Sequence, residues 1–230
     1  MRHLIFLHGW ATDSRIWEAQ RAALQERADL WTPDLPVWQA DWLLANLTKF
    51  EPSQTILVGW SLGGMLALEV CARGFAPAML VLISTCASFC RRPDFQLGWP
   101  LAVLRGMRQR LQSNPVQVVQ EFQQQLLGPQ ESAWQARLQP LLPQSQDPAW
   151  LAAGLDYLRQ KDLRPLLPKV AAGKLIISHG AADGIIPVAQ AYFLADQFPA
   201  ARFVSLGDTG HVPMVSRSQE VNSLLAAFLS

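Results

Sequence analysis

One serine in this sequence stands where a serine can act as a nucleophile. Ser61 is the centre of a G-x-S-x-G pattern at residues 59–63, between an apolar run at 55–58 and an apolar helical pattern that begins at Leu62. A sharp turn from strand to helix would hold the hydroxyl out at the end of a sheet, and the helix N-terminus behind it would favour developing negative charge. A chance Gly–Ser turn is the alternative, and the flanking strand and helix patterns favour the nucleophile.

A serine hydroxyl needs a general base near neutral pH. The sequence offers four histidines, His3, His8, His179 and His211. His211 lies in a loop of small residues between the last apolar run and the last helical pattern, which suits a side chain that must reach over the end of a sheet. We expect His211 to be the base, and His8 and His179 to be loop residues that hydrogen-bond to the backbone.

The third member of such a site is a carboxylate that orients the imidazole and stabilises its protonated form. Asp183 follows an apolar run that we interpret as a strand. The order Ser61, Asp183, His211 is one in which this triad is known to occur on a parallel sheet. Asp208 lies only three residues before His211, so we expect it to turn the loop, and we expect Asp34 to turn the chain after an earlier strand.

Acyl transfer creates a negatively charged oxygen that needs preorganised hydrogen-bond donors. The backbone N–H of Leu62, directly after the expected nucleophile, is one candidate. The loop after the first strand, residues 8–13, offers a second, because Gly9 allows a tight turn and the N–H of Trp10 follows it. The Trp10 indole would then lie over the mouth of the pocket, and an ordinary loop aromatic is the alternative for this residue.

The composition limits which other functions the chain could have. Half of its 230 residues are hydrophobic, 16% are charged and the formal net charge is +1, so bulk charge favours neither nucleic acid nor a membrane surface. The three cysteines have no spacing that supports a metal site, and we expect reduced thiols. The N-terminal apolar run is too short for a signal peptide, and no run is long enough to span a membrane. We expect a cytoplasmic monomer without a metal or organic cofactor.

Short apolar runs alternate along the chain with amphipathic stretches. This alternation predicts an α/β fold, a mostly parallel six-stranded sheet with helices on both faces. The predicted strands are at 4–7, 29–32, 55–58, 79–84, 174–178 and 202–206. The predicted helices are at 15–27, 39–48, 62–74, 188–198 and 218–229.

The stretch 85–160 interrupts this alternation and contains no convincing strand pattern. Its helical patterns are at 115–127, 134–142 and 148–158. We therefore divide the chain into an α/β core, residues 1–84 and 161–230, and a helical cap, residues 85–160. An insertion there would lie above the carboxyl ends of the strands, where such folds bind ligands. A helical subdomain that only adds stability is the alternative.

One helical face of the cap is apolar. It carries Val118, Val119, Phe122 and Leu126. We expect Phe122 to face the nucleophile across an apolar pocket, and plain core packing is the alternative.

These residues, in this order, resemble the α/β-hydrolase superfamily over nearly the whole chain. The resemblance implies an α/β-hydrolase fold with Ser61, Asp183 and His211 as the triad and with Trp10 and Leu62 as the oxyanion donors. The first strand already leads into the His-Gly-Trp loop at 8–10. We therefore expect six strands, without the two that precede this loop in a full-length member.

A narrower resemblance is carried by residues 8–10, 59–64 and 154–164, which are similar to the pimeloyl-[acyl-carrier protein] methyl ester esterases of biotin synthesis. It implies a serine carboxyl-ester hydrolase acting on the methyl ester of a carrier-bound pimeloyl chain. It also implies that a cap segment, here Phe122 to Leu126, lines the acyl pocket. Three other functions stay open: another small-ester or thioester hydrolase, a carbon–carbon bond hydrolase, and a non-catalytic ligand receptor on the same fold.

That family also uses arginines of the cap to hold the acidic carrier protein. A local basic cluster is present in this cap, with only Asp94 against it and not at the family's positions: Arg91, Arg92, Arg105, Arg108 and Arg110. A contact with acyl-carrier protein and a solvated helix face are equally good interpretations of this cluster.

Overall fold

The computed structural model describes residues 2–229, and its centre is one sheet of six strands in the order β2-β1-β3-β4-β5-β6. The strands are β1 (His3–Leu7), β2 (Asp29–Trp31), β3 (Thr55–Trp60), β4 (Met79–Ile83), β5 (Lys174–His179) and β6 (Arg202–Ser205). Every neighbouring pair is parallel, whereas we expected a mostly parallel sheet. Parallel strands all end at one edge, so the loops that follow them meet there.

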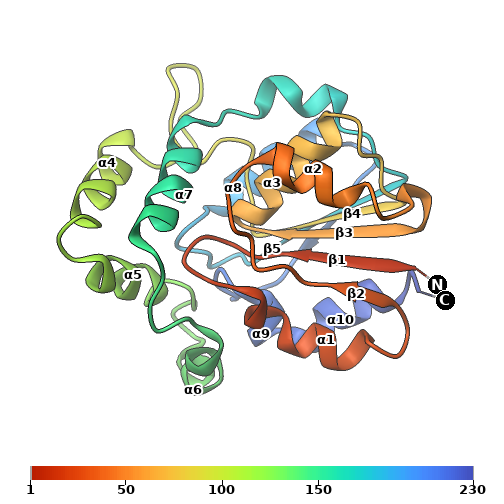
Figure 1. Cartoon of the computed structure of the whole chain (residues 1–230), viewed down its shortest axis with the longest axis horizontal. Coiled ribbons are helices and arrows are strands. Elements are labelled where there is room, and N and C mark those ends of the chain that lie inside the picture. The colour runs from red at the N-terminus through yellow and green to blue at the C-terminus, as the bar shows by residue number, and fades with distance from the viewer. Residues whose placement is uncertain (1, 230) are drawn as a thin grey trace.

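Helices cover both faces of the sheet, which explains the unbroken apolar runs of β3 and β4 (Figure 1). One face carries α1 (Glu18–Leu24), α9 (Pro213–Ser216) and α10 (Ser218–Ala226). The other carries α2 (Ala40–Leu47) and α3 (Leu62–Ala72), and α8 (Val188–Gln197) packs on β5. The helix predicted at 15–27 begins as a 3-10 turn, Ser14–Trp17, capped by the Asp13 side chain.

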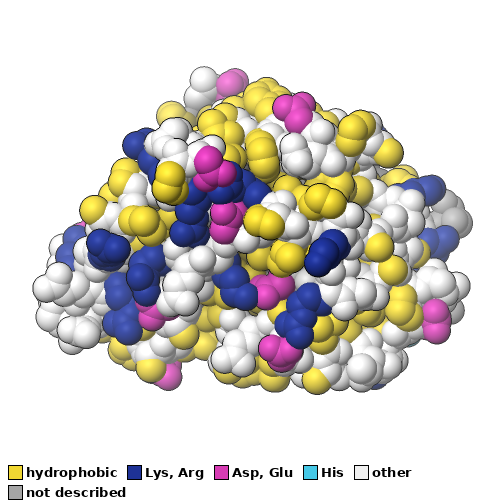
Figure 2. All heavy atoms as spheres, turned by 90° about the horizontal axis from the view of Figure 1, so that it is seen from above, with side chains coloured by type: hydrophobic (Ala, Val, Ile, Leu, Met, Phe, Trp, Pro, Cys, Tyr) yellow, Lys and Arg dark blue, Asp and Glu magenta, His cyan; other side chains and the backbone are white. Residues whose placement is uncertain are grey.

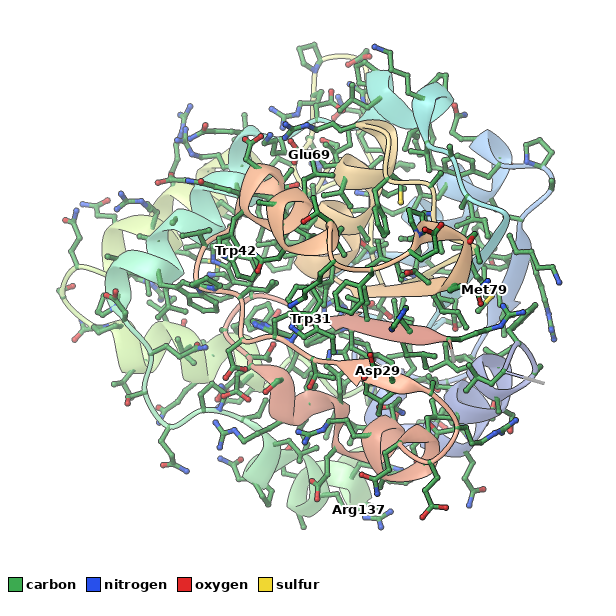
Figure 3. All side chains as sticks on the ribbon, turned by 45° about the vertical axis from the view of Figure 1, so that its right-hand side comes forward. Asp29, Trp31, Trp42, Glu69, Met79 and Arg137 are labelled. Carbon is green, nitrogen blue, oxygen red and sulfur yellow. The ribbon has the colours of Figure 1, made fainter. Side chains whose placement is uncertain are left out.

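Aromatic side chains pack at the end of the short edge strand β2. Trp31 at its end stacks on Trp42 of α2, with ring centroids 6.4 Å apart (Figure 3). The Lys49 ammonium lies 4.4 Å from the centroid of the Trp31 ring.

The cap lies between β4 and β5 in the chain and beyond the carboxyl ends of the strands in space, at the left of Figure 1. Its helices are α4 (Leu101–Arg110), α5 (Pro115–Gln123), α6 (Gln135–Leu138) and α7 (Pro148–Gln160). The Leu163 N–H donates to the Ala87 carbonyl at 2.8 Å, which joins the two ends of the insertion. None of the helices within residues 2–229 is both long and apolar enough to cross a membrane.

Two cap elements differ from the prediction. Helix α4 was not predicted, because only Leu104 of its ten residues is buried and its apolar pattern is weak. The predicted helix at 134–142 contains only the four residues of α6, with a 3-10 turn on each side. Pro140 lies in the second of these turns and lacks the N–H that a continuing α-helix would need.

Candidate active site

Ser61 occupies a strained turn between β3 and α3. Its backbone has φ +55° and ψ −123°, a conformation that a residue with a side chain rarely adopts. The two flanking glycines make the turn possible. A Cβ on Gly59 would lie 2.6 Å from the carbonyl oxygen of Gly63, and a Cβ on Gly63 would collide with the carbonyl oxygen of Leu7. The close approach of strand and helix expected from the G-x-S-x-G pattern is therefore present.

The structure brings Ser61, His211 and Asp183 into one hydrogen-bonded chain, although they are far apart in the sequence. The His211 Nε2 lies 2.9 Å from the Ser61 Oγ, and the His211 Nδ1 lies 2.8 Å from the Asp183 Oδ2. A carboxylate only accepts, so the imidazole carries its proton on Nδ1 and presents the Nε2 lone pair to the serine. The three side chains are almost completely buried.

Asp183 is held in its ionised form. Burial alone would raise the pKa of Asp183. Its interactions with His211, which include a hydrogen bond, have the opposite effect, as do the nearby His179 and the hydrogen bond from the Ile186 N–H. The pKa of Asp183 therefore lies below its ordinary value. Its second oxygen, Oδ1, accepts the N–H groups of Ile185 at 2.8 Å and Ile186 at 2.9 Å. These two bonds fix the carboxylate, so Oδ2 points at the imidazole.

The two expected oxyanion donors lie next to the serine. A Cβ on Gly9 would come within 3.0 Å of the Ser61 Cβ, so the loop that contains Trp10 runs directly against the nucleophile. Within residues 2–229, neither the Trp10 N–H nor the Leu62 N–H donates a hydrogen bond to another group. The Trp10 indole is anchored separately, because its Nε1 donates to the Leu151 carbonyl at 2.8 Å.

His8 and His179 are buried and bond to the backbone, as expected. The Leu35 N–H donates to the His8 Nε2 at 3.0 Å, and the His8 Nδ1 donates to the Gly9 carbonyl at 2.9 Å. The His179 Nε2 donates to the Ile186 carbonyl at 2.8 Å. Burial lowers the pKa of both imidazoles, which favours their neutral forms, and both histidines shape the loops beside the hydrogen-bonded Ser61, His211 and Asp183.

The two alternative carboxylates lie elsewhere. Asp208 is exposed, and Asp34 accepts the Ser14 N–H at 2.8 Å at the start of the 3-10 turn. Neither forms a hydrogen bond or ion pair with His211 among the described residues.

Comparison with known proteins identifies the family. Residues 4–224 match the family described as the alpha/beta hydrolase family. The chain belongs to the alpha/beta hydrolase family. Proteins named pimeloyl-[acyl-carrier protein] methyl ester esterase are similar over nearly their whole length. The one from Aromatoleum aromaticum is 32% identical over 96% of both chains, and the one from Nitrosomonas europaea is 32% identical over 97% of this chain and 94% of the relative.

Solved structures share the fold at lower identity. An esterase from Exiguobacterium antarcticum superimposes with a TM-score of 0.89 at 17% identity, and covers 100% of this chain and 92% of its own. MenH from S. aureus superimposes with a TM-score of 0.82 at 24% identity, and covers 99% of this chain and 93% of its own. These likenesses confirm the α/β-hydrolase fold with six strands.

The cap of this hydrolase encloses an apolar cavity of about 160 Å³. Val118 and Phe122 line it from α5, and the Phe122 ring meets the Trp10 ring edge-on, with centroids 4.8 Å apart. The other apolar lining side chains are Phe89, Trp99, Val103, Leu104, Met107, Leu155, Leu158 and Ile185. The cavity thus reaches the core at Trp10, beside an expected oxyanion donor, and at Ile185, beside Asp183.

Two members of the predicted apolar stripe do not line this cavity. Val119 borders a separate, more polar depression with Gln123 and Gln146. Leu126 follows the end of α5, and its buried side chain is not part of the cavity lining. Its carbonyl instead accepts the His211 N–H at 2.8 Å. The sequence pattern predicts these apolar residues on one face of a continuous helix. Helix α5 ends at Gln123, so the helical period does not extend to Leu126.

The arginines of the cap have counter-ions that the sequence did not reveal. Arg108 pairs with Asp156 of α7 at 3.0 Å, and Arg110 pairs with Glu121 of α5. Asp94, the one acid near the cluster in the sequence, pairs instead with Arg164 at 2.9 Å.

The remaining arginines of the cluster differ in whether they have hydrogen-bond or ion-pair partners. Arg92 donates to the carbonyls of Arg159 and Lys161, and the Arg91 Nε donates to the Gly98 carbonyl. Arg105 is exposed and has no ion-pair partner within residues 2–229. With respect to the described residues, the basic cluster of five arginines therefore contains one cation without an ion pair or hydrogen bond, Arg105, and four that are wholly or partly engaged.

The cysteines provide no second nucleophile. Cys71, Cys86 and Cys90 are buried free thiols, and burial raises the pKa of Cys71 to about 12. A thiol with so high a pKa stays protonated and unreactive. Among residues 2–229, no three His, Cys, Asp or Glu side chains are grouped so as to hold a metal ion.

Proposed function

We propose that this hydrolase is a serine carboxyl-esterase that removes the methyl ester from a pimeloyl chain carried by acyl-carrier protein, in biotin synthesis. The observation that carries the proposal is the chain of hydrogen bonds from Ser61 through His211 to Asp183, together with an apolar cavity whose lining includes Trp10 and Ile185, near the two ends of this chain. The names of the relatives at 32% identity support this substrate.

The geometry suits a two-step acyl transfer. His211 accepts the Ser61 proton as the serine oxygen attacks the ester carbonyl, and the N–H groups of Trp10 and Leu62 stabilise the resulting oxyanion. Collapse of this intermediate expels methanol, which takes its proton from His211, and leaves an acyl-enzyme. His211 then removes a proton from water, the water oxygen attacks the acyl-enzyme, and the carboxylic acid leaves as Ser61 regains its proton.

The cavity is of a size and polarity that suit a medium-length aliphatic chain. A dry apolar cavity of about 150 Å³ holds one benzene, which has six carbon atoms. The cavity of about 160 Å³ here therefore has room for most of a seven-carbon chain. Its polar members, Arg110, Glu121 and Gln125, come from the ends of α4 and α5 and give the chain a polar exit.

Helix α4 connects the cavity with the basic cluster, which supports a carrier-protein contact. Val103, Leu104 and Met107 line the cavity, while Arg105 on the same helix is exposed. Figure 2 views the molecule from above and shows Lys and Arg side chains gathered over the cap side, with Asp and Glu among them. We propose that the acidic carrier protein docks on this face, through Arg105 above all. The cytoplasmic location and the monomeric state also stay predictions.

The esterase proposal is tested by measuring hydrolysis of pimeloyl-[acyl-carrier protein] methyl ester and of p-nitrophenyl esters. We expect turnover of both, loss of turnover in Ser61→Ala with an unchanged Tm, and labelling of Ser61 by a fluorophosphonate. Turnover that survives in Ser61→Ala, or labelling at another serine, would contradict the triad. Turnover of p-nitrophenyl esters without turnover of the carrier-linked ester would leave an esterase with a different substrate.

The carrier-protein contact has a separate test. Arg105→Glu should raise the KM for the carrier-linked ester at low salt and leave the free methyl ester unaffected, because only the docking partner is acidic. Arg21→Glu on α1 is the matched control, since Arg21 is also exposed but lies outside the cap. Equal KM values for both variants on the carrier-linked ester would rule out docking through Arg105.

A further inference from the structure

The cap does more than enclose the cavity, because it also holds the backbone of the loop that carries His211. The His211 N–H donates to the Leu126 carbonyl, just after α5, at 2.8 Å. The preceding N–H, that of Gly210, donates to the Oε2 of Glu131 at 2.7 Å. Two successive backbone donors of the histidine loop are thus bound by the segment between α5 and α6.

Glu131 is the side chain that joins this segment to the loop. The same Oε2 atom also accepts the Gly128 N–H at 2.7 Å, so one carboxylate oxygen bridges the cap backbone and the histidine loop. Hydrogen bonds from N–H groups to a charged carboxylate are shorter and stronger than those to a neutral acceptor. The side chain is buried, with 5% of the residue exposed, so water does not weaken the bridge.

The glycines show how tightly the two segments are packed. A Cβ on Gly210 would collide with the backbone nitrogen of Gly128, and a Cβ on Gly180 would collide with the carbonyl oxygen of Gly210. The loop that carries His211 therefore packs between the cap segment at Gly128 on one side and the loop at Gly180, before Asp183, on the other. A shift of the cap segment is transmitted to the loop directly.

A role in stability alone is a poor explanation for this carboxylate. Its other oxygen, Oε1, is buried without a hydrogen-bond partner, and Glu131 forms no ion pair within residues 2–229. Burying a carboxylate with half of its acceptors unsatisfied costs free energy that a neutral side chain would not. An unsatisfied buried polar atom in a native structure calls for an explanation, and a functional role is one such explanation.

We propose that Glu131 is a positioning residue for His211, acting from the cap through the Gly210 N–H. The proposal rests on the proposed function, since it takes His211 as the general base. His211 must receive a proton from Ser61 and deliver it to the departing methanol oxygen, and both transfers depend on the position and orientation of the imidazole. A misplacement of about 1 Å costs roughly 100-fold in rate.

The expected result for Glu131→Ala is a kcat lowered by about 10- to 100-fold with a KM changed by less than about threefold. The loss should be the same for acetate and long-chain esters, because it affects the base and leaves the cavity intact. Glu131→Gln should restore most of the kcat, since one amide oxygen can accept both N–H groups, although its Tm should be lower than that of the wild type.

A matched control separates positioning from cap stability. Tyr157 on α7 donates to the buried Glu69 of α3 at 2.7 Å, so Tyr157→Phe also removes a hydrogen bond between cap and core, but far along the chain from the histidine loop. Tyr157→Phe should lower the Tm and leave kcat unchanged. Proton NMR supplies a second readout, the downfield proton between the His211 Nδ1 and Asp183, which should broaden or vanish only in Glu131→Ala.

The possible outcomes are distinguishable. Wild-type kcat and an unchanged downfield proton in folded Glu131→Ala would overturn the inference. If Glu131→Ala does not fold, Glu131→Asp takes its place, because its carboxylate is one methylene shorter. Equal kcat for Glu131→Asp, Glu131→Gln and the wild type would again overturn it. A wild-type protein that hydrolyses no ester would refute the proposed function, and the NMR comparison would still show whether Glu131 positions the histidine.

Discussion

Asp183 uses its two carboxylate oxygens for two different tasks, and this division makes it sensitive to a conservative change. Asp183→Asn should lower kcat by about 10⁴-fold, because an amide donor facing the imidazole favours the wrong tautomer. The kcat for a p-nitrophenyl ester measures the effect, and circular dichroism checks that the variant is folded.

Asp208→Asn is the control for this change. Asp208 is exposed and forms no hydrogen bond or ion pair with the imidazole in the described part of the chain, so the kcat of Asp208→Asn should stay within about twofold of the wild-type value. A severe loss in Asp208→Asn together with a mild loss in Asp183→Asn would require the two assignments to be exchanged.

The sequence pattern could bring Ser61, Asp183 and His211 together, as the structure does, but it could not predict the groups that hold them. Ser61, Asp183 and His211 each follow an apolar strand pattern, and the ends of parallel strands meet at one edge. The backbone of His211 is held by the Leu126 carbonyl, which accepts its N–H, and by the indole of Trp60, whose Nε1 donates to the His211 carbonyl at 2.7 Å. A backbone acceptor leaves no residue-type signal, and Glu131 stands in a polar stretch that resembles a solvated surface.

Helix α5 presents Val118 and Phe122 to the cavity, and this arrangement predicts how acyl length affects the rate. Phe122→Ala should lower kcat/KM for a long acyl ester by about 10-fold or more and for an acetate ester by much less, since only the long chain reaches the ring. Burying a side chain of this size contributes about 1.5–3 kcal/mol, of which the bound chain gains a part. Val119→Ala on the same helix is the control, because Val119 borders the other depression.

Measuring kcat/KM of Phe122→Ala with the acetate and octanoate esters of p-nitrophenol decides whether Phe122 contacts the acyl chain or only packs in the core. A fall in Tm of several degrees with equal losses on both esters would mean that Phe122 serves packing alone.

At the scale of whole elements, the core helices and strands were easier to predict than those of the cap. A strand buried on both faces has an unbroken apolar run, and a helix against a sheet has a clear apolar face. Helix α4 buries only Leu104 fully, and two of its arginines, Arg108 and Arg110, have their counter-ions on α7 and α5. Those partners depend on how cap helices pack against each other, which the local sequence does not express.

The molecule as a whole should lose stability as the pH falls below neutral. His8 and His179 are buried and neutral, and burial lowers the pKa of each below its value in the unfolded chain, about 6.5. Below that pH the unfolded chain takes up protons that the folded protein does not, so unfolding becomes more favourable. Each histidine contributes a slope of at most about 1.4 kcal/mol per pH unit.

Urea unfolding at pH 7.5, 6.5 and 5.5 measures this dependence. His8→Gln keeps an acceptor for the Leu35 N–H and removes one titrating group, so its free energy of unfolding should fall less steeply with decreasing pH than that of the wild type. Identical slopes for both proteins would mean that His8 takes up its proton over the same pH range in the folded and the unfolded states, so that burial does not lower its pKa.

The contact between the cap segment and the histidine loop has a consequence for protein engineering. In a hydrolase of this kind, a designer would treat the cap as a module to be exchanged for another acyl specificity. Here residues 126–131 of the cap are hydrogen-bonded to residues 207–211 of the core, through the Leu126 carbonyl and the Glu131 carboxylate. We therefore expect that a chimera with a different cap needs both segments transplanted together, because otherwise the proposed base would lose the hydrogen bonds that hold its loop.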